Sequence, residues 1–453
     1  TLAEKIFARH MVNEKGEQGV PYVKPGDTGF ARADLRFSHE YVTPMASIFF
    51  EHFVGKDAPV NEPGSILFFR DHLTFLKYVM PPDRVAAGLL DAANELATRQ
   101  AEFALKQGIR LHGEVESGGS EGICHSVMYQ DYALPGQVII GSDSHTPHSG
   151  ALGCVAFGVG TTDVFNSWTT RDVRVTVPES VKIEIRGEKP AGVTAKDFML
   201  AILAHPYVKE GKAIGKILEY TGDAVRALSV DERATMTNMA AEVGAFTGIV
   251  APDGKTVDFL VAHRGMPRAE AERLCEGLSS DADARWSETL VFDAAGIGSM
   301  VALPGDPGNG KALSDLGDVP IEIAYGGSCT AGKCTDMDMY AAVCADAVRD
   351  GRKVAEGVTF WIQFGSQDVK RYCEEKGYLA LFEEAGAKTI DPSCGACINA
   401  GPGVSTRRDQ VTVSAINRNF PGRSGPGQMY LASPYTVAAS AFAGKISEWR
   451  PAG

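Results

Sequence analysis

Short runs of β-branched and other apolar residues that end in glycine-containing polar turns recur along this chain, separated by longer amphipathic segments of helical pattern. Three such runs cover 137–140, 320–325 and 411–416. This alternation predicts an α/β architecture. Because ligands of open α/β sheets bind outside the carboxyl ends of strands, we expect the functional residues where these three runs end.

The length of 453 residues predicts several domains. Proline and glycine interrupt both periodic patterns near 177–180 and 302–308. We therefore expect three α/β domains, over residues 1–176, 177–305 and 306–453.

A long helix is predicted over 84–107. Asp83, after two prolines, is the expected N-cap, and Gly108 is the expected end. Its alanine- and leucine-rich composition indicates a structural role. The charged segment 259–287 is predicted to be helical scaffold, and 433–449 a closing helix.

The formal net charge of −13 argues against a nucleic-acid partner, because phosphate contacts need clustered Lys and Arg. No apolar run reaches the roughly 20 residues that cross a bilayer, and the first residues lack a signal-peptide core, so we expect no membrane partner and a cytoplasmic location. Nine cysteines at irregular spacings then favour free thiols, metal ligands or redox groups over disulfides.

Three cysteines form the strongest constellation. Cys329 follows the predicted strand 320–325, and Cys394 and Cys397 form a CxxC motif further on. Two thiolates at this spacing can bind one metal or cluster, and a third from another loop completes a three-thiolate face. One coordination position would stay open, which suits a Lewis acid.

Other interpretations of these cysteines remain open. A CxxC motif is also typical of a redox dithiol or of half a zinc site, and Cys334 could supply a fourth zinc ligand. The remaining thiols within apolar or helical patterns are expected to be packed or surface groups; they are Cys154, Cys275, Cys344 and Cys373.

The turn after 137–140 carries Asp143, Ser144 and His145. A carboxylate beside an imidazole tunes its pKa and suits proton transfer, although a capped turn gives the same pattern. His72, preceded by Asp71, and His125 are further candidates, each of which could equally be a structural histidine.

The turn after 411–416 carries Asn417, Arg418 and Arg423 among glycines. Arginine pairs bidentately with carboxylates, so this basic turn in an acidic protein predicts an anion site. A solvated surface turn is the alternative.

Together these motifs resemble the aconitase and isopropylmalate-isomerase superfamily over nearly the whole chain and in the expected order. Residues 141–146 are similar to its DSHT loop. Residues 327–330 and 394–397 are similar to its cluster-ligand motifs, and 417–423 to its substrate-binding NRNF…GR segment.

The resemblance implies a role for each matching residue. Cys329, Cys394 and Cys397 would hold a [4Fe-4S] cluster. Acid–base and hydrogen-bonding roles fall to Asp71, His72, His125, Asp143 and His145, with Glu219 as the active-site glutamate. Substrate binding falls to Ser144, Asn417, Arg418 and Arg423.

The function implied is that of the large subunit of a [4Fe-4S]-dependent hydro-lyase, either a hydratase or an isomerase. It would act on a small hydroxy di- or tricarboxylic acid like 3-isopropylmalate. The family's swivelling domain has no match in this chain, so a small subunit that carries it is the implied partner. A cluster-free RNA-binding relative, a structural zinc protein and an electron-transfer protein are the alternatives. Ala331 and Lys333 depart from the family's usual Asn and Arg, which puts the substrate contacts of this loop in doubt.

Overall fold

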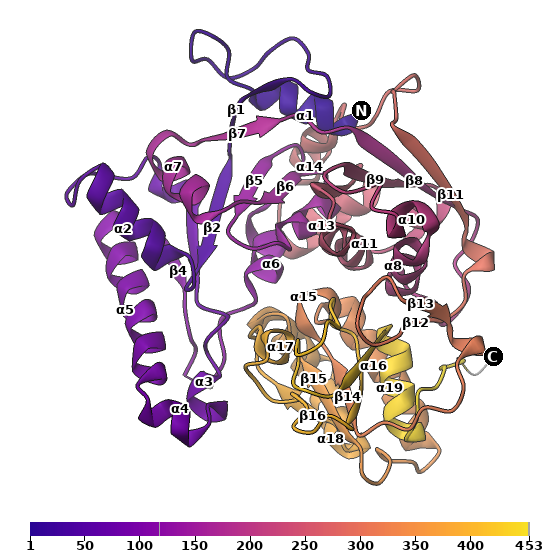
Figure 1. Ribbon diagram of the computed structural model, residues 1–453. Coiled ribbons are helices and arrows are strands. Elements are labelled where there is room, and N and C mark those ends of the chain that lie inside the picture. The colour runs from indigo at the N-terminus through magenta and orange to yellow at the C-terminus, as the bar shows by residue number, and fades with distance from the viewer. Residues whose placement is uncertain (117, 452–453) are drawn as a thin grey trace.

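The structure is a computed structural model that describes residues 1–116 and 118–451. Two parallel sheets and one larger mixed sheet, with helices packed on them, form the molecule (Figure 1). This confirms the α/β class. The third sheet, orange to yellow in Figure 1, lies beneath the other two.

The first sheet is five-stranded and parallel, in the order β4-β3-β2-β5-β6. Its strands are β2 (Leu35–His39), β3 (Ile66–Phe69), β4 (Arg110–His112), β5 (Val138–Gly141) and β6 (Val155–Gly158). All four residues of β3 are buried, as expected of a parallel strand covered on both faces. A separate antiparallel ribbon pairs β1 (Thr28–Arg32) with β7 (Asp172–Thr176).

The second sheet is four-stranded and parallel, in the order β10-β9-β8-β11. Its strands are β8 (Ser180–Arg186), β9 (Ile217–Thr221), β10 (Thr247–Val250) and β11 (Glu288–Asp293).

The third sheet has seven strands in the order β13-β12-β18-β17-β14-β15-β16. They are β12 (Met300–Ala302), β13 (Gly310–Ala312), β14 (Ile323–Gly326), β15 (Thr359–Gln363), β16 (Lys388–Ile390), β17 (Val411–Ser414) and β18 (Gln428–Ala432). β12 pairs antiparallel with β13 and β18, and the other pairs are parallel. β12 precedes residue 306 yet belongs to this sheet; the domain boundaries themselves stay a prediction.

The helices connect and cover these strands. With the first sheet lie α1 (Leu2–His10), α2 (Thr43–Phe53), α3 (Leu76–Val79), α4 (Pro82–Ala86), α5 (Leu89–Gln107), α6 (Cys124–Val127) and α7 (Thr161–Thr170). Between β8 and β11 the chain forms α8 (Ala195–Ala204), α9 (Pro206–Lys209), α10 (Asp223–Ala227), α11 (Val230–Asn238), α12 (Ala240–Val243), α13 (Gly254–Arg264) and α14 (Arg268–Cys275). The third sheet carries α15 (Ser328–Ala331), α16 (Cys334–Arg349), α17 (Gln367–Glu375), α18 (Tyr378–Ala385) and α19 (Pro434–Ala443).

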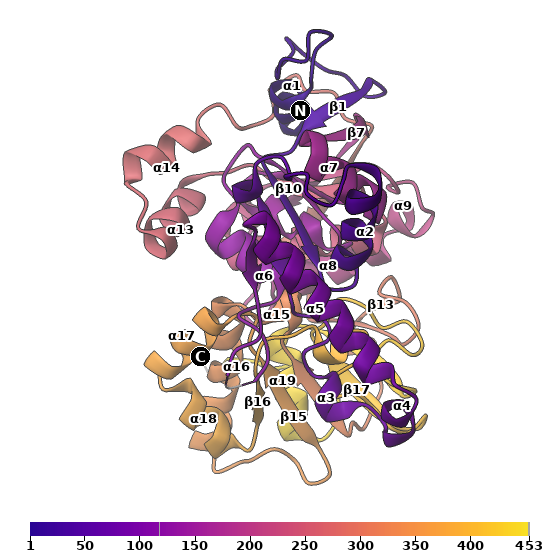
Figure 2. The ribbon, with the colours of Figure 1, turned by 90° about the vertical axis from the view of Figure 1, so that its left-hand side faces the viewer.

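The helix predicted over 84–107 is broken. Gly88 has φ +79°, a conformation that glycine adopts without strain, and it separates α4 from α5. Asp83 lies inside the first turn of α4 and makes no capping bond. Gly108, with φ +67°, does end α5. Figure 2 shows the resulting arm of α3, α4 and α5 extending from the first sheet past the third.

Three other predicted ranges also change at their ends. The run 320–325 forms a strand only from Ile323, and the predicted closing helix ends at Ala443. The segment 259–287 is helical only within α13 and α14.

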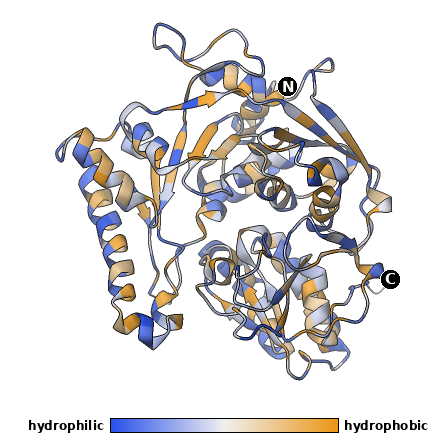
Figure 3. Ribbon diagram, viewed as in Figure 1, coloured by the Kyte–Doolittle hydropathy of each residue, from blue (hydrophilic) through white to orange (hydrophobic). Residues whose placement is uncertain are grey.

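One buried hydrophobic cluster joins the second sheet to the third. It includes Ile183 and Leu218 of the second sheet, Tyr325 and Leu431 of the third, and Cys397. Apolar residues follow the strands and the inward faces of the helices (Figure 3). None of the described helices has the length and apolar character to cross a membrane. The shared core brings the carboxyl ends of strands from different sheets to one place.

Candidate active site

The loop after β14 presents Cys329. Gly327 has φ +119°, and a Cβ at this position would lie 2.5 Å from the carbonyl oxygen of Gln363. Only glycine fits this turn. Cys329 follows at the start of the short helix α15, and its side chain is buried.

Cys394 and Cys397 stand on the turn after β16. The backbone N–H of Cys397 donates to the Cys394 carbonyl at 3.0 Å, and that of Cys394 donates to the Asp71 carbonyl at 2.7 Å. The CxxC motif is thereby attached to the first sheet, next to the predicted residues Asp71 and His72.

Amide and guanidinium groups lie around two of the three sulfurs, those of Cys329 and Cys397. The Asn417 side-chain amide lies 3.7 Å from Cys329 Sγ and 3.3 Å from Cys397 Sγ. Asn238 donates to Cys329 Sγ at 3.3 Å, and Arg423 donates to Cys397 Sγ at 3.4 Å. Such donors stabilise thiolate sulfur. Asn417 thus joins Cys329 to Cys397, and Cys394, on the same turn as Cys397, lies with its Sγ 3.9 Å from Asp71 Oδ2.

The spacing of the sulfurs favours a polynuclear group over one ion. The three sulfurs of Cys329, Cys394 and Cys397 do not all lie within 4.8 Å of one another. Ligands at about 2.3 Å on a single tetrahedral zinc ion would lie about 3.8 Å apart. Cys334, the fourth zinc ligand considered above, lies instead in a surface pocket with Asp231 and Tyr372.

Two of these groups, Cys329 and Cys394, are neutral thiols when no metal is bound. Burial, and then the proximity of Cys397, raises the pKa of Cys329 to about 12. Burial likewise raises the pKa of Cys394 well above its usual value. A bound metal would deprotonate these thiols, and its positive charge would balance the resulting thiolates. The donor set therefore fits a metal or a metal cluster.

Asp143 is the centre of a histidine network beside the thiols. Its carboxylate accepts a hydrogen bond from His125 Nε2 at 2.8 Å and from the backbone N–H of His145 at 2.7 Å. His72 Nε2 lies 3.5 Å away, and His72 Nδ1 lies 2.8 Å from Asp71. Burial alone would raise the pKa of Asp143, but the histidines, His125 first, hold it well below its usual range.

His145 connects this network to the arginine turn through Glu242. His145 Nε2 lies 2.8 Å from Glu242 Oε1, which also accepts from Arg418 Nε at 2.8 Å. Arg418 further donates to Ser144 Oγ at 3.0 Å. Burial alone would lower the pKa of His145, but Glu242 and Asp143 outweigh it and raise the pKa to about 9.

The structure does not bring Glu219 to this site. Its carboxylate accepts from Ser280 Oγ at 2.8 Å, and Ser280 in turn accepts from the backbone N–H of Leu2 at 2.7 Å. Glu219 thus faces α1, whereas the Glu242 carboxylate contacts His145 and Arg418. Residues 237–242 also resemble a segment of the family, although a helix surface explains the same pattern, and no role for Glu242 was predicted from it.

Sequence reasoning also missed Glu40, His39 and Asn238. The Glu40 carboxylate accepts from the backbone N–H groups of His72 and Leu73 at 2.8 and 2.6 Å, which fixes the Asp71–His72 turn. The His39 ring stacks on His72 with a centroid separation of 4.0 Å, and burial lowers its pKa to about 3. The sequence pattern that could have indicated them is the position of His39 and Glu40 at the end of strand β2.

The altered loop after Cys329 has a structural explanation. Lys333 is fully buried and donates to the Thr330 carbonyl at 2.6 Å and to Thr235 Oγ1 at 3.0 Å. Its ammonium pairs with Asp336 at 2.8 Å. Lys333 therefore stabilises the turn that holds Cys329. Ala331 is buried in the core of the third sheet.

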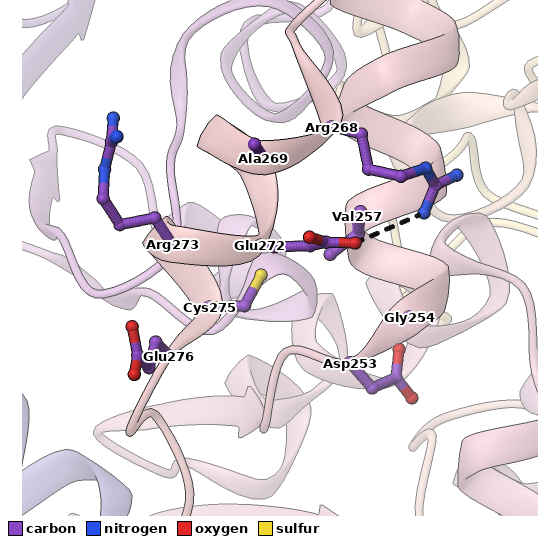
Figure 4. Close-up of a pocket in the computed structure, with 9 residues that line it drawn as sticks. All are labelled: Asp253, Gly254, Val257, Arg268, Ala269, Glu272, Arg273, Cys275 and Glu276. Atoms are coloured by element: carbon purple, nitrogen blue, oxygen red, sulfur yellow. Dashed lines mark ion pairs between the residues drawn. The ribbon is translucent and has the colours of Figure 1, made fainter.

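A pocket between α13 and α14 lies apart from this site (Figure 4). Its charged groups are mixed, with Arg268 pairing with Glu272 at 4.0 Å. Burial raises the pKa of Cys275 to about 11, which makes this thiol unreactive. The pocket lacks the converging polar groups of the thiol site.

Comparison with known proteins identifies the family. Residues 4–444 match the model of the aconitase family (aconitate hydratase). The 3-isopropylmalate dehydratase large subunit 1 of Pyrococcus furiosus is 36% identical over 452 residues, which cover 99% of this chain and 97% of that protein. The large subunit 1 from Methanopyrus kandleri is 34% identical, with 100% and 99% covered. The chloroplastic large subunit of Arabidopsis thaliana is 34% identical, with 99% and 86% covered. This chain therefore belongs to the aconitase family of hydro-lyases.

Proposed function

We propose that this chain is the large subunit of a [4Fe-4S]-dependent hydro-lyase that acts on a small hydroxy-dicarboxylic acid of the 3-isopropylmalate type. The observation that carries the proposal is the group of three thiols, two of them buried, beside the Asp143 histidine network and the arginine turn. The relatives that match over nearly their full length carry this activity in their names, which supports the substrate class.

Cys329, Cys394 and Cys397 would hold the cluster. Three protein thiolates leave one iron open, and that iron would supply a Lewis acid for the substrate hydroxyl and a carboxylate. The N–H groups of Asn238 and Arg423 on two of the sulfurs support this assignment.

His145 and Glu242 would hold and transfer a proton at the site. With its pKa raised to about 9, His145 is protonated at neutral pH. Burial alone would raise the pKa of Glu242, but His145 and Arg418 lower it, so this carboxylate is ionised. The proton on His145 Nε2, which Glu242 accepts in a hydrogen bond of 2.8 Å, would pass to the departing hydroxyl, and Asp143, 3.4 Å from Nδ1, would keep the ring oriented.

The arginine turn would bind the substrate carboxylates. Arg418 is held by Glu242 and Ser144, and Arg423 lies against Cys397. Arg423 thus lies beside a thiol and Arg418 beside the Glu242–His145 pair, and the planar fork of each can pair with two oxygens at once.

The partner would be a small subunit. The relatives are named as large subunits, and this chain covers nearly all of the archaeal ones. In the resemblance described above, the small subunit carries the swivelling domain, which supplies the base that takes a proton from carbon.

Anaerobic purification followed by iron and sulfide analysis tests the cofactor, and a hydration assay over small unsaturated diacids with the small subunit tests the reaction. We expect a brown protein that loses one iron readily to oxygen, because that iron has no protein thiolate. Colourless protein with stoichiometric zinc, or iron-loaded protein that is inert toward every diacid, would overturn the proposal.

Glu242→Gln is expected to lower kcat by about a hundredfold, a usual cost of disturbing a positioned acid–base group. Glu219→Gln is the matched control, since Glu219 is equally buried but faces α1. Steady-state kinetics of both variants measure the difference. A larger loss of kcat in Glu219→Gln would restore Glu219 as the active-site glutamate.

Arg418→Lys and Arg423→Lys are each expected to raise KM and to lower kcat/KM by about tenfold or more, with the iron and sulfide content unchanged. Lysine keeps the charge but loses the planar fork. Arg407→Lys, on the exposed rim of the same sheet, is the control. Wild-type kinetics in both site variants would mean that this turn does not bind substrate.

A further inference from the structure

Lys196 connects α8 to the strand that presents Asn417. Its Nζ donates to the Ile416 carbonyl at 2.6 Å and to the Ala415 carbonyl at 3.3 Å. These are the last two carbonyls before Asn417, and Lys196 itself is 2% exposed. The contact links the region of the second sheet to the carboxyl end of β17 in the third.

This buried ammonium lacks a carboxylate partner. Within the described residues, no acidic oxygen lies within the 4.0 Å ion-pair distance of Lys196 Nζ, whereas buried Lys333 pairs with Asp336 at 2.8 Å. A buried charge without compensation is costly. Burial lowers the pKa of Lys196 to about 8; the groups that oppose this are Glu242, Cys329 and Cys397. The carboxylate that opposes this most strongly, Glu242, belongs to the active site.

The neighbouring Asp197 makes the attachment rigid. Asp197 Oδ1 accepts from the backbone N–H of Met300 at 2.8 Å, at the start of β12. Its other oxygen accepts from the backbone N–H of Thr194 at 2.8 Å and caps α8. The first turn of α8 thus contacts the third sheet at both β12 and the end of β17, and it can fix the position of the residue that follows Ile416.

We propose that Lys196 is a positioning residue of this active site. Its ammonium fixes the end of β17 so that the Asn417 amide lies between Cys329, Cys397 and His145, and it adds a buried positive charge next to the residue that contacts two of the thiols. The role in the loaded enzyme rests on the proposed function, but the positioning of the β17 end does not require the cluster.

Lys196→Met tests the proposal, because methionine keeps a similar length and removes the charge and the donors. In the cluster-free protein, hydrogen exchange of the peptide spanning 411–423 should become several-fold faster, since two hydrogen bonds that hold this segment are lost. Lys209→Met, an exposed change on α9, should leave this exchange unchanged. If Lys196→Met does not fold, Lys196→Gln carries the same test.

In the reconstituted protein, Lys196→Met should lower the reduction potential of the cluster, because a nearby positive charge favours the more negative reduced state. It should also lower kcat by about tenfold, as expected for the loss of a charged hydrogen bond. Lys196→Arg, which keeps the charge, should retain most of the wild-type potential. The effects of Lys196→Met and Asn417→Ala on kcat should be non-additive, because one residue acts through the other.

Unchanged exchange of the 411–423 peptide in a folded Lys196→Met protein would overturn the proposal, as would full additivity with Asn417→Ala. Equal loss of potential in the Met and Arg variants would show that packing rather than charge matters, and would also overturn it. A wild-type protein without iron and sulfide would refute the proposed function instead, and the exchange measurement would still decide the role of Lys196.

Discussion

Replacement of Cys329, Cys394 or Cys397 by serine is expected to abolish cluster assembly and all hydro-lyase activity. Cys329 and Cys397 contact the amide of Asn417, and Cys394 shares the CxxC turn with Cys397, whereas Cys334 lies in a separate surface pocket and cannot replace a missing ligand. Serine is close to cysteine in size, and the fold should persist. Iron and sulfide content and the visible spectrum after anaerobic reconstitution measure the loss.

Cys334→Ser is the matched control. Cys334 stands only a few residues from Cys329 but lies on the far side of the turn, with Asp231 and Tyr372. Its replacement should leave the iron content and kcat unchanged. An equal requirement for Cys334 would contradict the three-thiolate assignment and revive the four-cysteine zinc site.

The second large effect concerns the partner. The reconstituted chain alone is expected to turn over at less than about one hundredth of the rate that it reaches with the small subunit, because elimination of water needs a base beside the substrate carbon. The three predicted imidazoles are already engaged: His125 Nε2 bonds to Asp143, His145 Nε2 to Glu242 and His72 Nδ1 to Asp71. We therefore expect the base to come from the small subunit.

A titration of the chain with the small subunit, at a fixed cluster content, measures this dependence. Activity should rise with the partner and saturate at a fixed ratio, while the thermal midpoint of the large chain changes little. Full activity of the chain alone would mean that one of its own residues is the base, and the two-subunit proposal would be wrong.

The sequence predicted the parts of the site that are local motifs. Cys394 and Cys397 share one turn, and Asp143 and His145 share another, so spacing alone makes their proximity predictable. The strand that ends at the Asp143 turn was predicted from its β-branched run, but β16, which precedes the CxxC turn, was not predicted.

Glu242 could not be found in this way. Every residue of α11, which precedes it, is buried, including Asp231, Glu232 and Arg233. The helix therefore lacks the amphipathic pattern that separates an inner from an outer face. Glu219 was predicted because its surroundings resemble those of the family's active-site glutamate. Only the tertiary packing of α1 near β9 shows that its side chain faces away from the site.

The break at Gly88 has a similar origin. A single glycine within a helical pattern usually costs about 1 kcal/mol and is tolerated. Here its positive φ redirects the chain, and α5 packs against α2, so the tertiary structure rather than the local pattern decides where the helix begins.

One carboxylate, Asp143, lies within ion-pair distance of His72, His125 and His145. The protonation equilibria of this group are therefore coupled. Protonation of one imidazole changes the field at the other two, so the limbs of a pH–rate profile report macroscopic constants of the whole group. A substitution at His125 should then displace the limb that a simple assignment gives to His145. Profiles of single and paired histidine variants would resolve the group into its microscopic equilibria.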